Sequence, residues 1–369
     1  LQKAGGLAYL GKIADATPSA ANIEHYAKIV REYSVLRQLL KAGEQIIESV
    51  HRSGDRSVID LVDAAEQQIS RIAERGARSL QGFEAIKDLV NSALSRIDDL
   101  YASGEKITGT TSGFSDLDNL TSGFQKADLV IVAARPSMGK TAFALGLAEH
   151  VAVKKNAPVA IFSLEMPGEQ LVMRLFSSIS RLDYGLVRTG QLADGDWPRL
   201  TDAIGALAES PMYIDATSAL TPVDLRARAR RLARERGQLG MVIVDYLQLM
   251  RVPEIRNNRV AEVSEISRSL KALAKDLDCP VIALSQLNRG LEQRPNKRPV
   301  LSDLRDSGAI EQDADTVLFL YRDEVYDDQS PDKGIAEVII GKQRNGPIGK
   351  VKLAFLGAQV RFGGLAHDG

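Results

Sequence analysis

The sequence predicts an α/β domain with a mostly parallel central sheet, preceded by an all-α region. Three observations lead to this fold class. Short apolar runs rich in valine and isoleucine recur after residue 116, and helical stretches separate most of the early ones, as in parallel sheets covered on both faces. Up to about Ser103 the periodicity is helical only. A loop ending in Gly-Lys-Thr follows the first apolar run and opens a helix.

The first hundred residues predict three amphipathic helices, at 20–50, 58–75 and 83–101. Thr17-Pro18-Ser19 precedes the first of them as a start signal. The third has an apolar stripe that needs a partner; such a stripe is usually core, but the Gly/Thr/Ser-rich connector at 104–113 keeps docking on another chain open. We therefore expect three regions: the remainder of a helical N-terminal domain at 1–80, a linker helix with its connector at 81–107, and the α/β domain at 108–369.

Six apolar runs are expected as strands of the α/β domain, at 129–133, 159–164, 241–249, 281–285, 316–321 and 336–341. The last strands come close together, and Asn345-Gly346 is a favoured hairpin turn between them. The sheet should therefore be largely parallel and end in a hairpin.

A phosphate-binding loop is predicted before the helix expected at 142–153. It consists of Ala134, Arg135, Pro136, Ser137, Met138, Gly139, Lys140 and Thr141. Backbone N–H groups can surround phosphates, Lys140 can reach the β- and γ-phosphate oxygens, and Thr141 can ligate Mg²⁺. Ala134 replaces the usual glycine and adds only a methyl group. A chance turn is the alternative, disfavoured because a strand and a helix flank the loop, so ATP and Mg²⁺ are the expected cofactors.

Polar residues at the ends of three other runs extend this site. Asp245 ends the run that begins at Met241, where P-loop enzymes carry the acid that supports Mg²⁺. Glu165 ends another run and could polarise the attacking water, and Gln286 could sense the γ-phosphate. A charge at the end of a buried run often marks only where the chain surfaces, so either acid alone is weak evidence. Together with the loop they predict an ATP-hydrolysing motor site.

The composition narrows the class of protein further. The single cysteine, Cys279, excludes an internal disulfide framework, fits a reducing cytoplasm and is expected to be buried. The four histidines lack metal-ligand spacing, and no apolar run is long enough to span a membrane. The formal net charge of −1 means that any DNA contact must come from local basic loops. The chain begins with Leu1, and we expect a segment to be missing upstream.

The motifs of the chain resemble, in order from about Thr108 to Phe362, those of bacterial replicative DNA helicases of the DnaB family. They read ARPSMGKT, FSLEM, VDYLQLM, EISRSLKALAKDL, ALSQLNR, DLRDSGAIEQDAD, YRDEVY and GKQRNGPIGK. GGLAYL and TPSAANIEHYAKIVRE resemble more weakly the latter part of the family's helical N-terminal domain, and we expect the first part of that domain to be missing. Ala134 is common in the family, whereas Asp306 stands where glutamate is usual. The phosphate loop alone would indicate only an NTPase.

The resemblance implies a RecA-like motor domain, six copies of which form a ring around one DNA strand. The nucleotide site would lie between subunits, and Lys342 and Arg344 would enter the neighbour's site, where an arginine stabilises charge on the γ-phosphate. From spacing alone, these residues would be two solvated charges on a hairpin edge. Arg174 matches a family position near the nucleotide base.

The DNA contacts follow from the same resemblance. Arg305, Asp306 and Gly308 match the loop that grips single-stranded DNA, the last two through main-chain N–H groups. The preceding segment at 288–299 is basic, through Arg289, Arg294, Lys297 and Arg298. In a ring channel it would add salt-sensitive phosphate contacts; taken alone it is a solvated loop.

A denser arginine run, between Arg226 and Arg236, is interpreted differently. Thr221-Pro222 begins a helix there, and the arginines are distributed around most of its surface. We expect a solvated helix with salt bridges to Asp224 and Glu235, and no DNA site.

The predicted function is an ATP-dependent replicative DNA helicase, with 5′→3′ movement implied by the family. Single-stranded and forked DNA, five further copies of the chain, primase and a helicase loader are the expected partners, with no membrane. Three alternatives stay open: a recombinase that forms open filaments, a scaffold with a degenerate motor, and an ATPase switch indifferent to DNA. The intact Gly-Lys-Thr and both acids argue against degeneracy.

Overall fold

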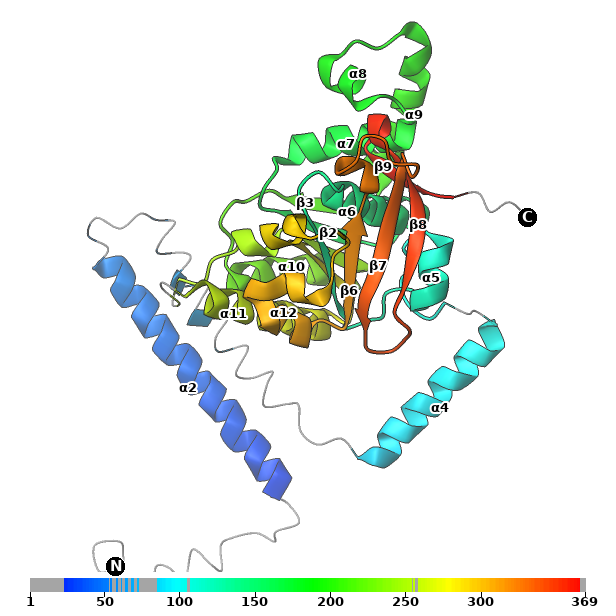
Figure 1. Ribbon diagram of the computed structural model, residues 1–369. Coiled ribbons are helices and arrows are strands. Elements are labelled where there is room, and N and C mark those ends of the chain that lie inside the picture. Colours follow the sequence, from blue (N-terminus) through cyan, green and yellow to red (C-terminus); the bar gives the residue numbers. More distant parts are fainter. Residues whose placement is uncertain are drawn as a thin grey trace, which may run out of the picture. The chain divides into compact units, whose positions relative to one another are not determined.

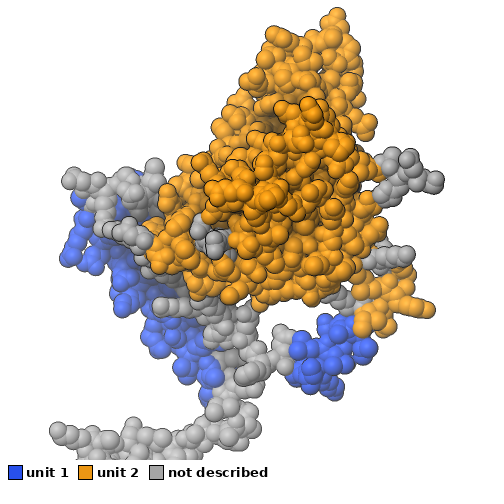
Figure 2. All heavy atoms as spheres, viewed as in Figure 1, with its two compact units in different colours: residues 1–96 blue, residues 97–369 orange. Residues whose placement is uncertain are grey.

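The computed structural model describes residues 23–52, 85–104, 107–253, 255 and 258–365, with scattered residues between 54 and 72. The chain divides into two compact units, Leu1–Arg96 and Ile97–Gly369 (Figure 2). The second contains the sheet and every predicted site residue. No helix in the described part of the chain is long and apolar enough to cross a membrane.

Two long helices belong to the N-terminal part of the chain. Helix α2 spans Ile23–His51, and α4 spans Ile86–Ser103 across the boundary between the units. They confirm the first and third predicted helices, whereas most of the second, at 58–75, and Thr17-Pro18-Ser19 lie outside the described residues. Both helices expose large apolar side chains, including Leu40 of α2 and Leu94 of α4.

A single nine-stranded sheet, in the order β3-β2-β4-β5-β1-β6-β7-β8-β9, organises the second unit (Figure 1). The pairs from β3 to β6 are parallel, and β7, β8 and β9 continue antiparallel. The bounds are β1 Leu129–Ala134, β2 Val159–Ser163, β3 Met212–Asp215, β4 Met241–Asp245, β5 Val281–Gln286, β6 Thr316–Tyr321, β7 Ile335–Gln343, β8 Gly349–Leu356 and β9 Arg361–Gly364.

The predicted strands are confirmed with one correction. The run at 241–249 is a strand only as far as Asp245, and a 3₁₀ turn, η5 Leu247–Leu249, follows it. The hairpin at Asn345-Gly346 joins β7 and β8 as expected. The sequence did not indicate β3 or β9, each of four residues at an edge of the sheet.

The remaining elements of the second unit are helices and short helical turns. The α-helices are α5 Ser115–Thr121, α6 Lys140–Glu149, α7 Gly168–Ser180, α8 Tyr184–Thr189, α9 Trp197–Glu209, α10 Pro222–Arg236, α11 Arg259–Leu277 and α12 Gly308–Asp313. The helix predicted at 142–153 is thus α6 continued by a π-helical turn, η3 His150–Lys154. The 3₁₀ turns are η4 Asp194–Asp196, η6 Arg289–Gln293, η7 Leu301–Ser307, η8 Asp323–Val325 and η9 Gly357–Gln359.

Two hydrophobic cores cover the two faces of the sheet. Alternate residues of a strand point to opposite faces, so Val130 and Val132 of β1 join a core with α5, α6 and α7, whereas Leu129 and Ile131 join one with α10 and α11. All six β1 residues are therefore buried. The unbroken apolar runs of the sequence follow from this double coverage.

Helix α10 carries the arginine run, and its salt bridges were predicted only in part. Thr221 caps the helix as expected, and Arg231 pairs with Glu235. The predicted salt bridge to Asp224 is wrong, because the carboxylate of Asp224 bonds back to Thr221 in the capping box. Other partners include Asp276 of α11, which binds Arg226 and Arg230, and Asp215 of β3, which binds Arg228.

Cys279 is buried, as predicted. Burial, with a smaller contribution from the neighbouring Asp278 carboxylate, raises the pKa of its thiol to about 12. A thiol that stays protonated at neutral pH is a poor nucleophile, so its role is packing.

Candidate nucleotide site

The predicted phosphate loop, Glu165, Asp245 and Gln286 meet where the parallel strands end at their carboxyl termini, here termed the carboxyl edge of the sheet. Strand register sets this meeting: Ser163 of β2 lies opposite Asp245 of β4, and Ala134 of β1 lies opposite Gln286 of β5. Four segments far apart in sequence thus deliver polar groups to one edge. In open α/β sheets, ligands bind at such an edge.

The phosphate loop connects β1 to α6 without a side-chain cap. Gly139, the N-cap residue, has φ of +96°, and a Cβ there would approach the Phe362 ring of β9 to 3.0 Å. Glycine is therefore required by conformation and by space. Because no side chain caps the first turn of α6, its N–H groups are available to an anion.

Lys140 and Thr141 open helix α6 beside Asp245. The Thr141 hydroxyl donates a 2.8 Å hydrogen bond to Asp245 Oδ2, and Lys140 Nζ donates a long one of 3.3 Å to the Ala134 carbonyl. Burial lowers the pKa of the Lys140 amine, against the nearby Asp245 and Glu165 carboxylates. Burial also raises the pKa of Asp245, and the Glu165 charge adds to this effect. The charged forms of both residues are thus held in a poorly solvated site.

The donor set at this position fits Mg²⁺. Asp245 Oδ1 is buried and lacks a hydrogen-bond partner in the described chain, while Oδ2 holds the Thr141 hydroxyl. A buried acceptor without a partner is costly unless a ligand satisfies it. The described residues contain no group of three or more His, Cys, Asp or Glu able to hold a metal alone, so a cation would also need phosphate oxygens. That is the usual arrangement for Mg²⁺ bound with a nucleotide.

Glu165 lies two residues beyond the end of β2 and is exposed. The backbone just before it is anchored, because the Leu164 amide donates to the Asp245 carbonyl at 2.7 Å. Its charge acts on its neighbours by raising the pKa of Lys140, Asp245 and Tyr246. An exposed carboxylate close enough to act on Lys140 and Asp245 could polarise a water beside the phosphate loop.

Gln286 ends β5 and has a partner that the sequence did not reveal. Gln248, in η5, donates to the Ser285 hydroxyl at 2.8 Å and to the Gln286 carbonyl at 3.3 Å, and its own Oε1 accepts from the Gln286 amide. Gln248 therefore ties the ends of β4 and β5 together. Its only sequence signal is its proximity to Asp245 within VDYLQLM.

Two arginines connect the phosphate loop to other segments of the chain: Arg135, within the loop, and Arg322, outside it. Arg135 is buried, and it donates to the Leu287 carbonyl and pairs with Glu292. Arg322, to which sequence reasoning assigned no role, donates to the Ser137 carbonyl at 3.0 Å and lies over the Phe355 ring. Both contacts hold the loop backbone, so neither arginine is wholly available to a phosphate.

Arg174 projects from α7 toward the same edge. Its guanidinium carbon lies 5.9 Å from the Tyr184 ring centroid, and its charge lowers the pKa of Asp245. Its Nε is buried and has no hydrogen-bond partner in the described chain.

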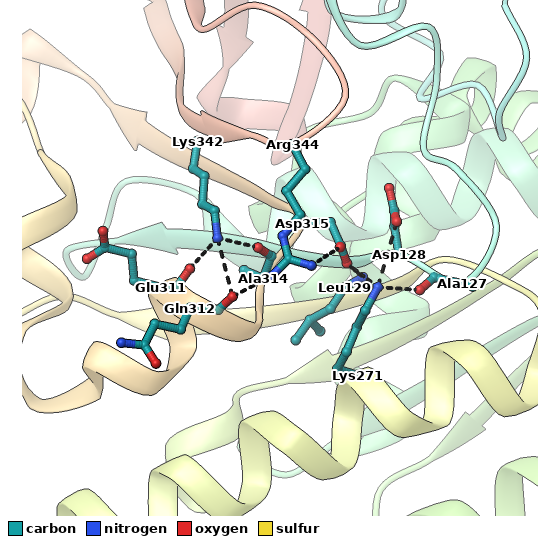
Figure 3. Close-up of polar contacts among 10 residues, drawn as sticks. All are labelled: Ala127, Asp128, Leu129, Lys271, Glu311, Gln312, Ala314, Asp315, Lys342 and Arg344. Atoms are coloured by element: carbon teal, nitrogen blue, oxygen red, sulfur yellow. Dashed lines mark hydrogen bonds and ion pairs between the residues drawn. The ribbon is translucent and has the colours of Figure 1, made fainter.

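Arg344 lies at the opposite, amino edge of the sheet, just beyond β7 (Figure 3). Its guanidinium bonds Asp315 Oδ1 at 3.2 Å and the Gln312 carbonyl at 2.6 Å. Asp315 in turn accepts from the Leu129 amide, at the first residue of β1. The phosphate loop begins at the other end of β1, so the length of that six-residue strand, roughly 16 Å, separates Arg344 from its own P-loop. The structure does not bring Arg344 to the site residues at the carboxyl edge of its own chain.

Lys342, two residues earlier, has a similar intrachain environment. Its ammonium donates to the Glu311, Gln312 and Ala314 carbonyls at the carboxyl end of α12 (Figure 3). Burial, followed by the Arg344 charge, lowers the pKa of Lys342. Both cations thus contact the end of one short helix.

The residues predicted to bind DNA lie just before that end. Arg305 and Asp306 belong to η7 and Gly308 begins α12; the side chains at 305–307 lie outside the description. Gly308 is exposed.

The preceding basic segment is held within the chain. Arg294 pairs with Asp303, Arg298 with Glu337, and Lys297 lies over the Tyr326 ring. It is therefore less free for phosphate contacts than a solvated loop would be.

The fold and the site define a class of protein. A P-loop on the central strand of a mostly parallel sheet, with acids on the two strands beyond β5, is the arrangement of a P-loop NTPase with a RecA-like core. Residues 109–364 match the family model of the DnaB-like helicase C-terminal domain, and residues 1–32 match that of the DnaB-like helicase N-terminal domain. The chain belongs to the DnaB family of replicative DNA helicases.

Curated relatives and solved structures agree. The chain is 51% identical over 368 residues to the replicative DNA helicase DnaB of Haemophilus influenzae, covering 99% of this chain and 79% of the relative. It is 50% identical to that of Geobacillus stearothermophilus, covering 98% and 79%. A solved DnaB-like replicative helicase, described with its interactions with primase, superposes with a TM-score of 0.82 at 35% identity over 99% of this chain and 85% of its own. A second solved structure, described as an ATPase domain, gives a TM-score of 0.74 at 39% identity, covering 77% and 100%.

Proposed function

We propose that the chain is the motor subunit of a homohexameric ring that hydrolyses ATP with Mg²⁺, moves 5′→3′ along one DNA strand and parts the duplex at a replication fork. One observation carries the proposal: Lys140 with Thr141, Asp245 and Glu165 converge on one edge from the ends of three strands of one sheet. The helicase identity of the family supports DNA as the track, and we infer that the chain acts in the cytoplasm.

Each residue of the site has a distinct role in this proposal. The N–H groups of the loop and Lys140 hold the phosphates, and Glu165 orients the attacking water and accepts its proton. Thr141 and Asp245 would hold Mg²⁺, which would neutralise charge on the β- and γ-phosphates. Gln286, held by Gln248, would detect the γ-phosphate, and Arg174 would lie near the nucleotide.

The position of Arg344 supports a site shared between subunits. It lies about a strand length from its own P-loop, beyond the reach of a side chain, so it can serve only the nucleotide of another copy. The apolar side chains exposed on α2 and α4 also favour assembly, because solvent-facing stripes of this size are usually covered by a partner. In a closed ring every subunit forms the same interface with its neighbour, so no interface is left open.

The DNA and protein partners rest on family likeness. Arg305, Asp306 and Gly308 would contact the backbone of the encircled strand, and the sequence-independent part of that binding should weaken as salt rises. Primase and a helicase loader are proposed partners, since a solved DnaB-like relative is described with primase.

Strand separation on a forked DNA tests the proposal. With ATP and Mg²⁺ the parent chain should open the fork, and the Glu165→Gln variant should bind nucleotide normally but hydrolyse it at least roughly 100-fold more slowly, because it retains the site's shape without its base. Glu169→Gln is the matched control, an exposed acid in the first turn of α7, and it should behave like the parent.

Two results would contradict the proposal. Rapid hydrolysis by Glu165→Gln would remove that residue from the mechanism. Absence of both unwinding and DNA-stimulated hydrolysis in the parent, at a concentration where it is oligomeric, would remove the helicase function itself.

A further inference from the structure

A cluster of four charges lies at the amino edge of the sheet, away from the nucleotide site. It comprises Asp128, Lys271, Asp315 and Arg344, from four separate segments, and is termed the Asp315 cluster (Figure 3). Asp315 is its centre: it accepts from the Leu129 amide at 2.8 Å and pairs with both Lys271 and Arg344. Lys271 also lies 3.8 Å from Asp128 and donates to the Ala127 carbonyl at 2.7 Å.

Within this cluster, Asp315 is fixed and Arg344 is comparatively free. The Asp315 side chain is 6% exposed, and its backbone amide donates to the Leu129 carbonyl at 2.9 Å while its carboxylate receives the Leu129 amide. The Arg344 side chain is 47% exposed. Asp315 holds it twice, because the Arg344 backbone amide donates to the Asp315 carbonyl at 2.9 Å and the guanidinium meets the carboxylate. A buried acid thus anchors the base of a long side chain that is half exposed.

The charge balance favours the same arrangement. The cluster has two carboxylates and two cations, and Lys271 alone cannot neutralise both acids. Arg344 therefore supplies the second positive charge of the cluster, while about half of its side chain stays exposed. Gln312 supplies the second contact through its carbonyl, at the end of the helix that follows the DNA loop.

We propose that Asp315 is a positioning residue for Arg344, holding the guanidinium at the rim of the amino edge in the orientation from which it meets the nucleotide of the neighbouring subunit. This rests on the proposed function of Arg344 in trans. Asp315 lies at the start of β1, a strand length from the P-loop, and in this proposal it acts through Arg344. A side chain that is already oriented loses little conformational entropy when it contacts the nucleotide. A misplacement of such a group by about 1 Å can lower the reaction rate about 100-fold.

The Asp315→Asn variant tests this role. Asparagine keeps the size and can still accept from the Leu129 amide, but it loses the charge that holds Arg344. The expected result is a fall of roughly 10- to 100-fold in kcat for DNA-stimulated ATP hydrolysis, with KM for ATP within about twofold, because the P-loop at the other edge is unchanged. An unchanged or raised kcat would overturn the proposal.

A second pair of variants separates positioning from stability. Asp315→Asn removes the main partner of the half-buried Lys271, so the double variant Asp315→Asn with Lys271→Gln should recover much of the lost Tm. Positioning predicts that kcat stays low in the double variant; recovery of kcat together with Tm would overturn it. Glu337→Gln is the matched control: Glu337, on β7 of the same sheet, is as buried as Asp315 and pairs with Arg298. It should lower Tm without the selective loss of kcat.

Mixed oligomers show whether Asp315 acts through the neighbouring site. Lys140→Ala subunits have a defective P-loop but an intact Arg344. When they are mixed with Arg344→Ala subunits, or separately with Asp315→Asn subunits, some interfaces pair a sound P-loop with a sound arginine. ADP with aluminium fluoride, which mimics the transferring phosphoryl group, should be retained only at such complete interfaces. The amount of trapped ADP therefore measures how many of them form.

The outcomes divide cleanly. Trapping above that of either parent in both mixtures supports the proposal. Trapping restored with Arg344→Ala but not with Asp315→Asn overturns the role of Asp315 and leaves the trans arginine intact. Trapping restored in neither mixture overturns the trans arginine itself, and the role of Asp315 with it.

Discussion

The two edges of the sheet differ in how well the chain satisfies its own charges. At the carboxyl edge, Asp245 Oδ1 is buried without a partner in the described chain, and Lys140 has one long hydrogen bond. At the amino edge, Asp315 binds a backbone amide and two cations, and Lys342 donates to three carbonyls. The two edges are opposite ends of the same strands, so we attribute the difference in hydrogen-bond and ion-pair partners to the different roles of the two edges.

The contrast teaches where a ligand is expected. Unmet donors and acceptors in a poorly solvated site cost stability, and they are retained where a ligand supplies the missing partners. The unmet groups at the carboxyl edge are therefore those that the proposed nucleotide and metal would satisfy. At the amino edge, Asp315 and Lys342 each have several partners within the chain, and the Arg344 side chain is 47% exposed, as its proposed role in a neighbouring subunit requires.

Replacing Asp245 by asparagine tests the contrast with the largest expected effect. The variant should lose roughly 10- to 100-fold in Mg²⁺-dependent hydrolysis, because the carboxylate orients the Thr141 hydroxyl and supports the cation. Without ligand it should be more stable than the parent at neutral pH. The folded-state pKa of Asp245 is raised, so the folded protein disfavours the charged form, and its stability rises as pH falls toward the ordinary carboxyl pKa.

Steady-state hydrolysis across a Mg²⁺ titration and thermal melting at neutral pH measure the two effects. Asp315→Asn, at the other edge, is the comparison and should lower both stability and turnover. If Asp245→Asn were less stable than its parent, the carboxyl edge would already be satisfied within the chain, and the contrast would fail.

The sequence predicted the parts of this molecule that depend on contiguous residues. The P-loop could be read because strand, loop and helix follow one another, and the inner strands because burial on both faces leaves unbroken apolar runs. Strand β3 was missed because its four residues are only partly buried at an edge. The single family-level departure, Asp306, has a side chain outside the description.

The partners of charged side chains could not be predicted, because they depend on how separate elements pack. Asp276, on α11, forms salt bridges with two arginines of the neighbouring helix α10. Proximity in the sequence had instead indicated Asp224 as their partner. Family likeness predicted that Arg344 enters a neighbour's site but gave no indication of Asp315, although only 29 positions separate them. Gln248 likewise reaches Gln286 across two strand ends.

Replacing Gln248 by leucine sharpens the comparison with an intermediate effect. Loss of its hydrogen bonds, each worth about 1 kcal/mol, should loosen Gln286 and lower kcat about fivefold while KM for ATP changes little. Gln238 provides a control at the amino edge, where its amide donates to the Leu277 and Asp278 carbonyls at 2.9 and 3.0 Å. Gln238→Leu should cost similar stability, measured by urea unfolding, without the kinetic effect. Equal losses of kcat in both variants would assign the effect to stability alone.

Replacing Asp128 by asparagine should give the smallest effect and tests the charge balance of the Asp315 cluster. Burial, and next the Asp315 carboxylate, raise the pKa of Asp128 to about 6, against the cations of Lys271 and Arg344. A raised carboxyl pKa means that the folded state binds the proton more tightly than the unfolded chain, so stability falls as pH rises through about 6. Asp128→Asn should therefore gain on the order of 1 kcal/mol in free energy of unfolding at pH 7.5 and almost nothing near pH 4. Urea unfolding at both pH values measures this, with Asp278→Asn, a mostly exposed acid at the same edge, expected to change little at either. A loss of stability at pH 7.5 would mean that Lys271 needs both acids, and that the cluster is balanced without Arg344.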